Sequence, residues 1–175
     1  MATIGELNRE YLQKAQALNL LVECLADGDV NATIAIVAEA PGSREVEMKL
    51  PLVGGSGKLL WTVLGRIGIR RQHCYITNVV KKRLVDGPKG KEGVSKNELA
   101  HWKALLDWEL SRLPNVKYIL VLGNVALNAL LGHNGIDQWR GSVLTHADRS
   151  YIIAHNPANI MRKPSVEPIF QLDCM

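Results

Sequence analysis

The stretch TIAIVAEAPG, from Thr33 to Gly42, decides the fold. Its β-branched apolar run is typical of a buried strand, and the Pro-Gly pair that closes it is typical of a tight loop. Three later runs have the same character, namely CYITNVV, VKYILVLG and YIIAH. We therefore expect four strands, near residues 33–38, 74–79, 117–122 and 151–155.

Helical spacing of apolar residues fills most of the chain between these strands. It predicts an amphipathic helix over residues 5–26, within an N-terminal segment 1–28. A glycine-rich turn at 54–57 opens a second helix, and a capping box at Ser95–Glu98 opens a third. Strands that alternate with helices predict an α/β fold with a parallel sheet covered on both faces.

Composition bounds the class of protein. The chain has 175 residues, of which 47% are apolar and 22% charged, so we expect a single globular domain over 1–175 rather than a disordered or collagen-like chain. No apolar run reaches the ~18 residues that span a bilayer, and the N-terminus lacks a signal pattern, so we expect a cytoplasmic protein without a membrane partner. The three cysteines are far apart and form no C-x-x-C, which argues against a disulfide framework and against a sequence-local metal site.

Residues 81–96 carry a net charge of +4, from six basic and two acidic residues. The net charge of the chain is +4, which permits a nucleic-acid partner. Residues 81–96 show no apolar periodicity and predict an exposed loop that carries Lys81, Lys82 and Arg83. Such a loop is either a solvated surface or a set of phosphate contacts.

Polar and turn-forming residues follow the strands at their carboxyl ends, where ligands bind in parallel α/β sheets. Glu39 and Glu45 flank Pro41–Gly42, which forms either a plain turn with solvated acids or a rigid loop that presents backbone N–H groups to a ligand. Asn78 ends the second strand, either as a turn residue or as an amide that pairs with the edge of a base.

The segment after the last strand combines a donor, an apolar tip and a cation. His155 and Asn156 come first, and a strand-end His is often merely structural. Ile160, Met161 and Arg162 follow, and this combination suits a wedge that enters a nucleic-acid groove.

GGSGK, at Gly54–Lys58, is not a P-loop. That motif has the form G-x-x-x-x-G-K-[ST], and Leu52 and Leu59 stand at its two anchor positions here. No apolar strand precedes the segment. We therefore exclude binding of nucleoside triphosphates there.

Taken in order, EAPG, PLVGGSGKLL from Pro51, YITNVVKKR, LG, WRG and the final NPA resemble family 4 of the uracil-DNA glycosylase superfamily over roughly residues 33–170. The resemblance implies a three-layer α/β/α sandwich around a four-stranded parallel sheet. It also implies hydrolysis of the N-glycosidic bond of deoxyuridine in DNA, after the base leaves the helix. Uracil-containing DNA would then be the substrate.

The resemblance also assigns roles to residues. Ala38, Ala40 and Gly42 would place backbone donors at the uracil, beside Glu39, and Glu45 matches a second acid. Asn78 would read the base edge, while the last loop would stabilise the departing uracil anion and fill the vacated stack. Under this interpretation the residues divide into three groups: catalytic Glu39, Glu45, His155 and Asn156; substrate-binding Ala38, Ala40, Gly42, Leu52 and Asn78; and DNA-binding Lys81, Lys82, Arg83, Ile160, Met161 and Arg162.

Three departures from the family bear on activity. Leu52 stands where the family has a Phe that stacks on uracil, a contact worth ~1–3 kcal/mol. Asn156 stands where the family has His, with His155 one residue earlier. Of the four cysteines that hold the family's iron–sulfur cluster, only Cys24 lies near a matching position, so we expect no cofactor and expect packing around Trp102 in its place.

Two hypotheses follow. One is an active monofunctional uracil-DNA glycosylase of DNA repair. The other is a glycosylase-like module with weak or no catalysis that binds DNA or a partner, either by itself or attached to a replication protein such as a phage-type DNA polymerase. We expect a monomer that works in the cytoplasm, at the nucleoid or in a phage-infected host.

Overall fold

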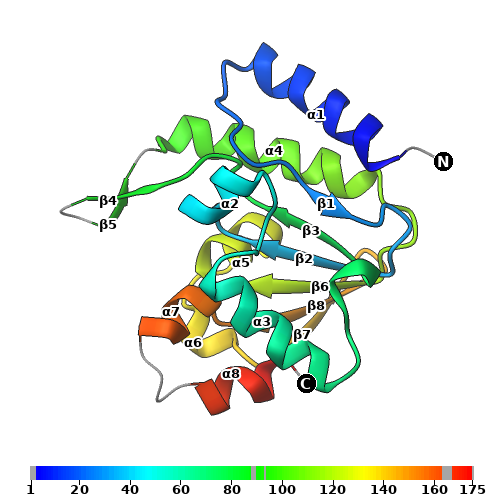
Figure 1. The fold of residues 1–175 in the computed structure, drawn as a ribbon, viewed down its shortest axis with the longest axis vertical. Helices are drawn as coiled ribbons and strands as arrows, with labels where there is room; N and C mark the ends of the chain where they lie inside the picture. Colours follow the sequence, from blue (N-terminus) through cyan, green and yellow to red (C-terminus); the bar gives the residue numbers. More distant parts are fainter. Residues whose placement is uncertain (1–2, 88–89, 93, 163–166, 175) are drawn as a thin grey trace.

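A computed structural model describes residues 3–87, 90–92, 94–162 and 167–174. Its main sheet has six strands in the order β1-β3-β2-β6-β8-β7 (Figure 1). The four central strands are parallel, as expected, and their carboxyl ends meet at one edge. They are β2 (Ile34–Ala38), β3 (Cys74–Asn78), β6 (Tyr118–Leu122) and β8 (Arg149–Ala154).

Two short antiparallel strands extend the sheet beyond the four expected ones. β1 (Asp27–Gly28) pairs with β3, and β7 (Val143–His146) pairs with β8. The turn between β7 and β8 uses Ala147 and Asp148 with φ of 47° and 61°. Asp148 is one of the residue types that favour this conformation but Ala147 is not, and no glycine marks the turn, so the sequence does not predict this hairpin.

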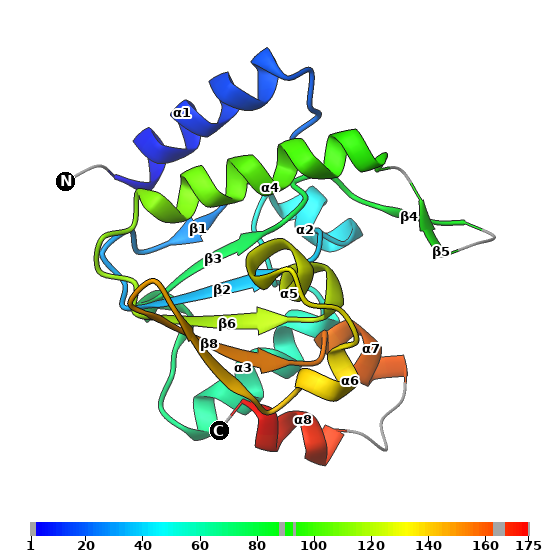
Figure 2. The ribbon, with the colours of Figure 1, turned by 180° about the vertical axis from the view of Figure 1, so that it is seen from behind.

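Helices cover both faces of the sheet, which confirms the α/β/α sandwich (Figures 1 and 2). Successive strand residues point to opposite faces, so β2 sends Ala35 and Val37 into one core and Ile36 and Ala38 into the other. The first core contains α1 (Ile4–Ala17), α4 (Lys96–Ser111) and α5 (Asn124–Leu131), and the second contains α3 (Gly55–Arg66), α7 (Pro157–Arg162) and α8 (Glu167–Asp173).

The N-terminal helix is shorter than predicted. It ends at Ala17 instead of near residue 26, because Asn19 takes a left-handed φ of 54° and turns the chain away. Residues 23 and 24 then donate their backbone N–H groups to the carbonyl of Lys81. The capping box is confirmed at its Ser side, since Ser95 accepts a hydrogen bond from the Glu98 N–H.

The segment 81–96 is not a plain loop. It contains an antiparallel hairpin of β4 (Val85–Gly87) and β5 (Gly90–Glu92), while residues 88–89 and 93 lie outside the described part. Three further short elements complete the fold: α2 (Ser43–Met48), the 3-10 turn η1 (Arg71–His73) and α6 (Ile136–Trp139). None of the described helices is long and apolar enough to cross a membrane.

Candidate nucleobase site

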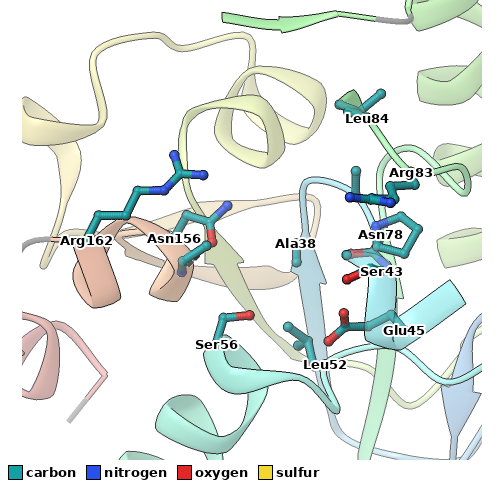
Figure 3. Close-up of a pocket in the computed structure, with 14 residues that line it drawn as sticks. Ala38, Ser43, Glu45, Leu52, Ser56, Asn78, Arg83, Leu84, Asn156 and Arg162 are labelled. Carbon is teal, nitrogen blue, oxygen red and sulfur yellow. Dashed lines mark hydrogen bonds between the residues drawn. The ribbon is translucent and has the colours of Figure 1, made fainter. Parts of the chain in front are cut away.

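A cavity of about 210 Å³ lies at the carboxyl ends of the parallel strands (Figure 3). It brings together side chains from segments far apart in the sequence. Nine of the predicted site residues line it: Ala38, Ala40, Gly42, Glu45, Leu52, Asn78, Arg83, Asn156 and Arg162.

The loop after β2 and the end of β3 form one unit at the floor of this cavity. The N–H of Val79 donates to the carbonyl of Ala38 (2.8 Å), and the N–H of Val80 donates to the carbonyl of Glu39 (2.9 Å). The pairing of β2 with β3 thus continues past the last strand residue. This continuation fixes the start of the loop relative to Asn78.

Asn78 is buried, with an exposed fraction of 2%, and it lines the cavity. Its Nδ2 has no hydrogen-bond partner, which among the described residues is true of only one other buried side-chain atom, the Tyr11 hydroxyl. An unpaired buried donor is unfavourable by about 1–3 kcal/mol and is rare in native proteins. A ligand with an acceptor atom in this cavity would satisfy it.

Glu45 connects the two loops that form one wall of the cavity. Its carboxylate is buried, and Oε1 accepts hydrogen bonds from the N–H groups of Val53 (3.0 Å) and Gly54 (2.7 Å). A Cβ at Gly42 would lie 2.8 Å from Oε2, and a Cβ at Gly54 would lie 3.0 Å from Oε1. Glycine at both positions lets the carboxylate sit between the loops.

Leu52 lines the same wall in a strained backbone conformation. Its φ is +52°, a region that residues with a side chain rarely adopt. Two donors hold its carbonyl, namely Trp61 Nε1 at 3.0 Å and Arg71 Nη1 at 3.2 Å. The side chain is buried with an exposed fraction of 7%, and no aromatic side chain is among the described residues that line the cavity.

Asn156 forms the opposite wall and connects it to Glu39. Its Oδ1 accepts from the N–H of Ala158 (3.0 Å) at the start of α7, and its Nδ2 donates to Glu39 Oε2 (3.4 Å). Gly123 permits this position, since a Cβ there would lie 2.9 Å from Asn156 Cβ. Glu39 therefore stands just behind the cavity rather than among its lining residues.

His155 points away from the cavity. Its Nε2 lies 3.4 Å from Oδ1 of Asp137, which is on α6. Of the two residues that begin this loop, the structure brings only Asn156 to the cavity.

The structure places the three basic residues that we predicted to contact DNA in three different environments. The prediction that Lys81 is exposed is wrong, because its exposed fraction is 1% and it pairs with Glu109 of α4. The two residues are 28 positions apart in the sequence, so local sequence patterns do not indicate this ion pair. Lys82 pairs with Glu98 at 2.7 Å. Arg83 is exposed and lines the cavity.

The wedge prediction also needs a correction. Ile160 is 2% exposed and packs in the second core, because α7 turns that side of the helix towards α3 and the sheet. Met161 is 52% exposed, and its side chain lies beside Gly55. Arg162 is exposed and lines the cavity across from Arg83 (Figure 3).

The residues do not fit a four-thiolate cluster. The chain has three cysteines, and Cys74 and Cys174 lie in the second core, whereas Trp102 lies in the first. Trp102 is fully buried beside α1, as we expected. Burial raises the pKa of the Cys24 and Cys74 thiols to about 11.

The sequence did not single out every residue of the cavity. Pro41 belongs to the predicted Pro-Gly loop, whereas the sequence does not predict Ser43 and Ser56, although each sits in the first turn of a helix that a glycine caps. A small polar residue just after such a glycine is a usable signal. The remaining lining residues are Leu84 and Ala158.

The fold and the site together define a class: a three-layer α/β/α protein with a small polar cavity at the carboxyl edge of its sheet. The model of the uracil DNA glycosylase superfamily matches residues 25–172. The chain therefore belongs to the uracil-DNA glycosylase superfamily.

Several relatives are similar to most of the chain. A type-4 uracil-DNA glycosylase from Pyrobaculum aerophilum is 30% identical over 158 residues, which cover 84% of this chain and 77% of the relative. One from Archaeoglobus fulgidus is 31% identical over 83% of this chain and 75% of the relative. A shorter match, to one from Thermotoga maritima, is 38% identical over 45% of this chain and 43% of the relative.

Proposed function

We propose that this protein is a DNA repair enzyme that hydrolyses the N-glycosidic bond of deoxyuridine in DNA, releasing uracil and leaving an abasic site. Membership of the superfamily and the names of the relatives support the reaction class. The observation that carries the proposal is the unpaired Nδ2 of Asn78, buried at the floor of a base-sized cavity.

Asn78 recognises the edge of the flipped base. Its Nδ2 donates to uracil O4, and its Oδ1 accepts from N3–H. Cytosine presents an amine and a bare nitrogen at those two positions, so both contacts would be lost. A site that leaves buried polar groups unpaired with the wrong base discriminates strongly.

Asn156 and Glu39 act on the bond that breaks. Negative charge builds on uracil O2 as the sugar becomes oxocarbenium-like, and Asn156 Nδ2 is the donor that stabilises it, a contribution of about 3–4 kcal/mol for a well-placed donor. Glu39 orients the water that attacks the sugar. The hydrogen bond from Asn156 to Glu39 keeps the two groups on one side of the cavity.

Arg83 and Arg162 hold the DNA. They lie on opposite sides of the cavity mouth, so they contact phosphates on either side of the flipped nucleotide (Figure 3). Met161, exposed on α7, fills the gap that the base leaves.

The test is excision of uracil from a labelled oligonucleotide that contains one uracil. The oligonucleotide is offered as a single strand, as a duplex with A opposite uracil and as a duplex with G opposite uracil, and alkali then cleaves the abasic sites. Matched oligonucleotides with cytosine or thymine at that position are the controls. We expect cleavage of the uracil strands and none of the controls. Intact uracil strands at enzyme excess would overturn the proposal.

A binding module without catalysis is the second candidate. The observation that favours it is Leu52, which gives the cavity an aliphatic wall where a stacking ring would hold the base. Such a module would bind uracil-containing or abasic DNA in a mobility-shift assay without cleaving it, so the same oligonucleotides separate the two functions.

A further inference from the structure

Lys81 is buried in the first core directly behind Asn78. Its ammonium group donates to the backbone carbonyl of Asn78 (3.0 Å), to Glu109 Oε2 (2.8 Å) and to the hydroxyl of Thr77. The exposed fraction is 1% for both side chains of the Lys81–Glu109 pair. All three donors of the ammonium group are used within the protein, so this lysine is not a DNA contact.

Glu109, the partner of Lys81, also accepts hydrogen bonds from two side chains of β3. Its Oε1 accepts from the hydroxyls of Tyr75 and Thr77, each at 2.7 Å. Burial and the neighbouring carboxylate raise the pKa of Tyr75 well above its ordinary value, so the hydroxyl keeps its proton and donates. The carboxylate of one α4 residue thereby holds two side chains of β3.

The backbone at Lys81 is fixed as well. Its carbonyl accepts from the N–H groups of Glu23 (2.8 Å) and Cys24 (3.0 Å). The ring of Tyr11, from α1, lies 4.9 Å from the ammonium group and covers it. The chain just after Asn78 is thus held from two sides.

We propose that the Lys81–Glu109 ion pair is a positioning device for Asn78: it fixes the carbonyl of Asn78 from inside the core and so sets where the amide projects into the cavity. This inference builds on the proposed function, because it assigns the pair to excision of uracil by Asn78. The pair touches no substrate, so neither member is a catalytic residue.

A conventional single substitution is a poor test. Removing one member of a buried ion pair leaves an unpaired charge and destabilises the fold, whereas removing both charges together is often tolerated. We therefore choose two uncharged double variants: the methionine double variant, Lys81→Met with Glu109→Gln, and the glutamine double variant, Lys81→Gln with Glu109→Gln. They differ only at position 81, where glutamine offers an amide donor for the Asn78 carbonyl and methionine offers none.

The matched control is Arg140→Met with Asp173→Asn. This double variant also removes an ion pair whose carboxylate is buried. The pair joins residues 140 and 173 at 2.6 Å, and neither residue lines the cavity. Thermal unfolding of all three variants gives the loss of stability against which the loss of excision is compared.

We expect the methionine double variant to excise uracil about tenfold more slowly at saturating enzyme, with an unchanged Kd for uracil-containing DNA. The glutamine double variant should recover part of that rate. The control should excise at the rate of the unmodified protein. Equal rates in the methionine double variant and the unmodified protein, or an equal loss in the control, would overturn the inference.

A second readout does not depend on activity. The side-chain amide signals of Asn78, assigned in ¹⁵N spectra by their absence from Asn78→Ala, should shift in the methionine double variant and stay in place in the control. Unshifted signals would overturn the inference even if the protein excises uracil. If the methionine double variant does not fold, the glutamine double variant should itself excise uracil more slowly than the unmodified protein and shift these signals, and no change in either would likewise overturn the inference.

Discussion

Ala38 and Asn78 are the last residues that face each other in the parallel pairing of β2 and β3. The chain leaves the sheet at the same level from both strands, so the Pro41 loop and the Asn78 amide line one cavity. Parallel register, rather than closeness in sequence, therefore builds this side of the candidate site.

Replacing Asn78 with Ala should lower the rate of uracil excision by about two orders of magnitude, equivalent to ~3 kcal/mol. The thermal midpoint should change little, because the unpaired Nδ2 gives up no hydrogen bond. Single-turnover excision and thermal unfolding measure the two effects. Asn115→Ala, at an exposed asparagine beyond the end of α4, is the control; an Asn78→Ala enzyme as fast as this control would contradict the role in recognition.

Replacing Leu52 with Phe should raise excision about tenfold, because a ring on this wall can stack on the base, a contact worth ~1–3 kcal/mol. The rate of uracil excision at limiting substrate measures this change. Leu21→Phe makes the same change at an exposed position outside the cavity and should leave the rate unchanged. A slower Leu52→Phe enzyme with normal stability would mean that the wall does not face the base.

Arg83→Gln and Arg162→Gln should each reduce the slope of log affinity against log salt by roughly one unit, the value for one lost phosphate contact. Binding to an abasic-site duplex at several salt concentrations gives the slope. Arg112→Gln, at the end of α4, should leave it unchanged. Unchanged slopes for both cavity arginines would show that they are only solvated.

The thiols should be unreactive in the folded protein. Burial raises the pKa of Cys24 and Cys74 to about 11 and that of Cys174 to about 12, from an ordinary value near 9. A thiol reagent at pH 8 should therefore label no cysteine until denaturant is added, when three react. Rapid labelling of the native protein would contradict the burial of these residues.

The same pKa shifts of the thiols determine how the free energy of unfolding changes with pH. Below pH 9, the ordinary thiol pKa, the thiols are protonated in both the folded and the unfolded chain. In that range their burial in the neutral form contributes its full amount to the free energy of unfolding. Between pH 9 and about 11 the unfolded chain ionises first, and the free energy of unfolding falls. A variant with all three cysteines changed to Ala should show a smaller fall in the thermal midpoint over this range.

The central sheet could be predicted because buried parallel strands are continuous apolar runs, which the sequence displays directly. The cavity followed from it, since polar residues at strand ends converge in any such sheet. β1 and β7 could not be predicted, because β1 has two residues and the β7 turn lacks a glycine.

Charge and exposure were harder to predict than position. Lys81 stands in a basic run, and nothing in that run reveals that Glu109 of α4 pairs with it in the core. Ile160 and Met161 are adjacent apolar residues, and only the orientation of α7 decides that the first is core and the second is exposed. Both depend on contacts between distant segments, which local patterns do not encode.

The approach of Gly57 to Leu52 constrains how this cavity can be remodelled. A Cβ at position 57 would lie 2.1 Å from the Leu52 carbonyl, far inside contact distance. In a directed-evolution library aimed at new base preferences, codon 52 can be varied without moving its backbone only while codon 57 stays glycine. Every clone with a side chain at 57 must first move the loop that carries residue 52, so it samples a different cavity altogether.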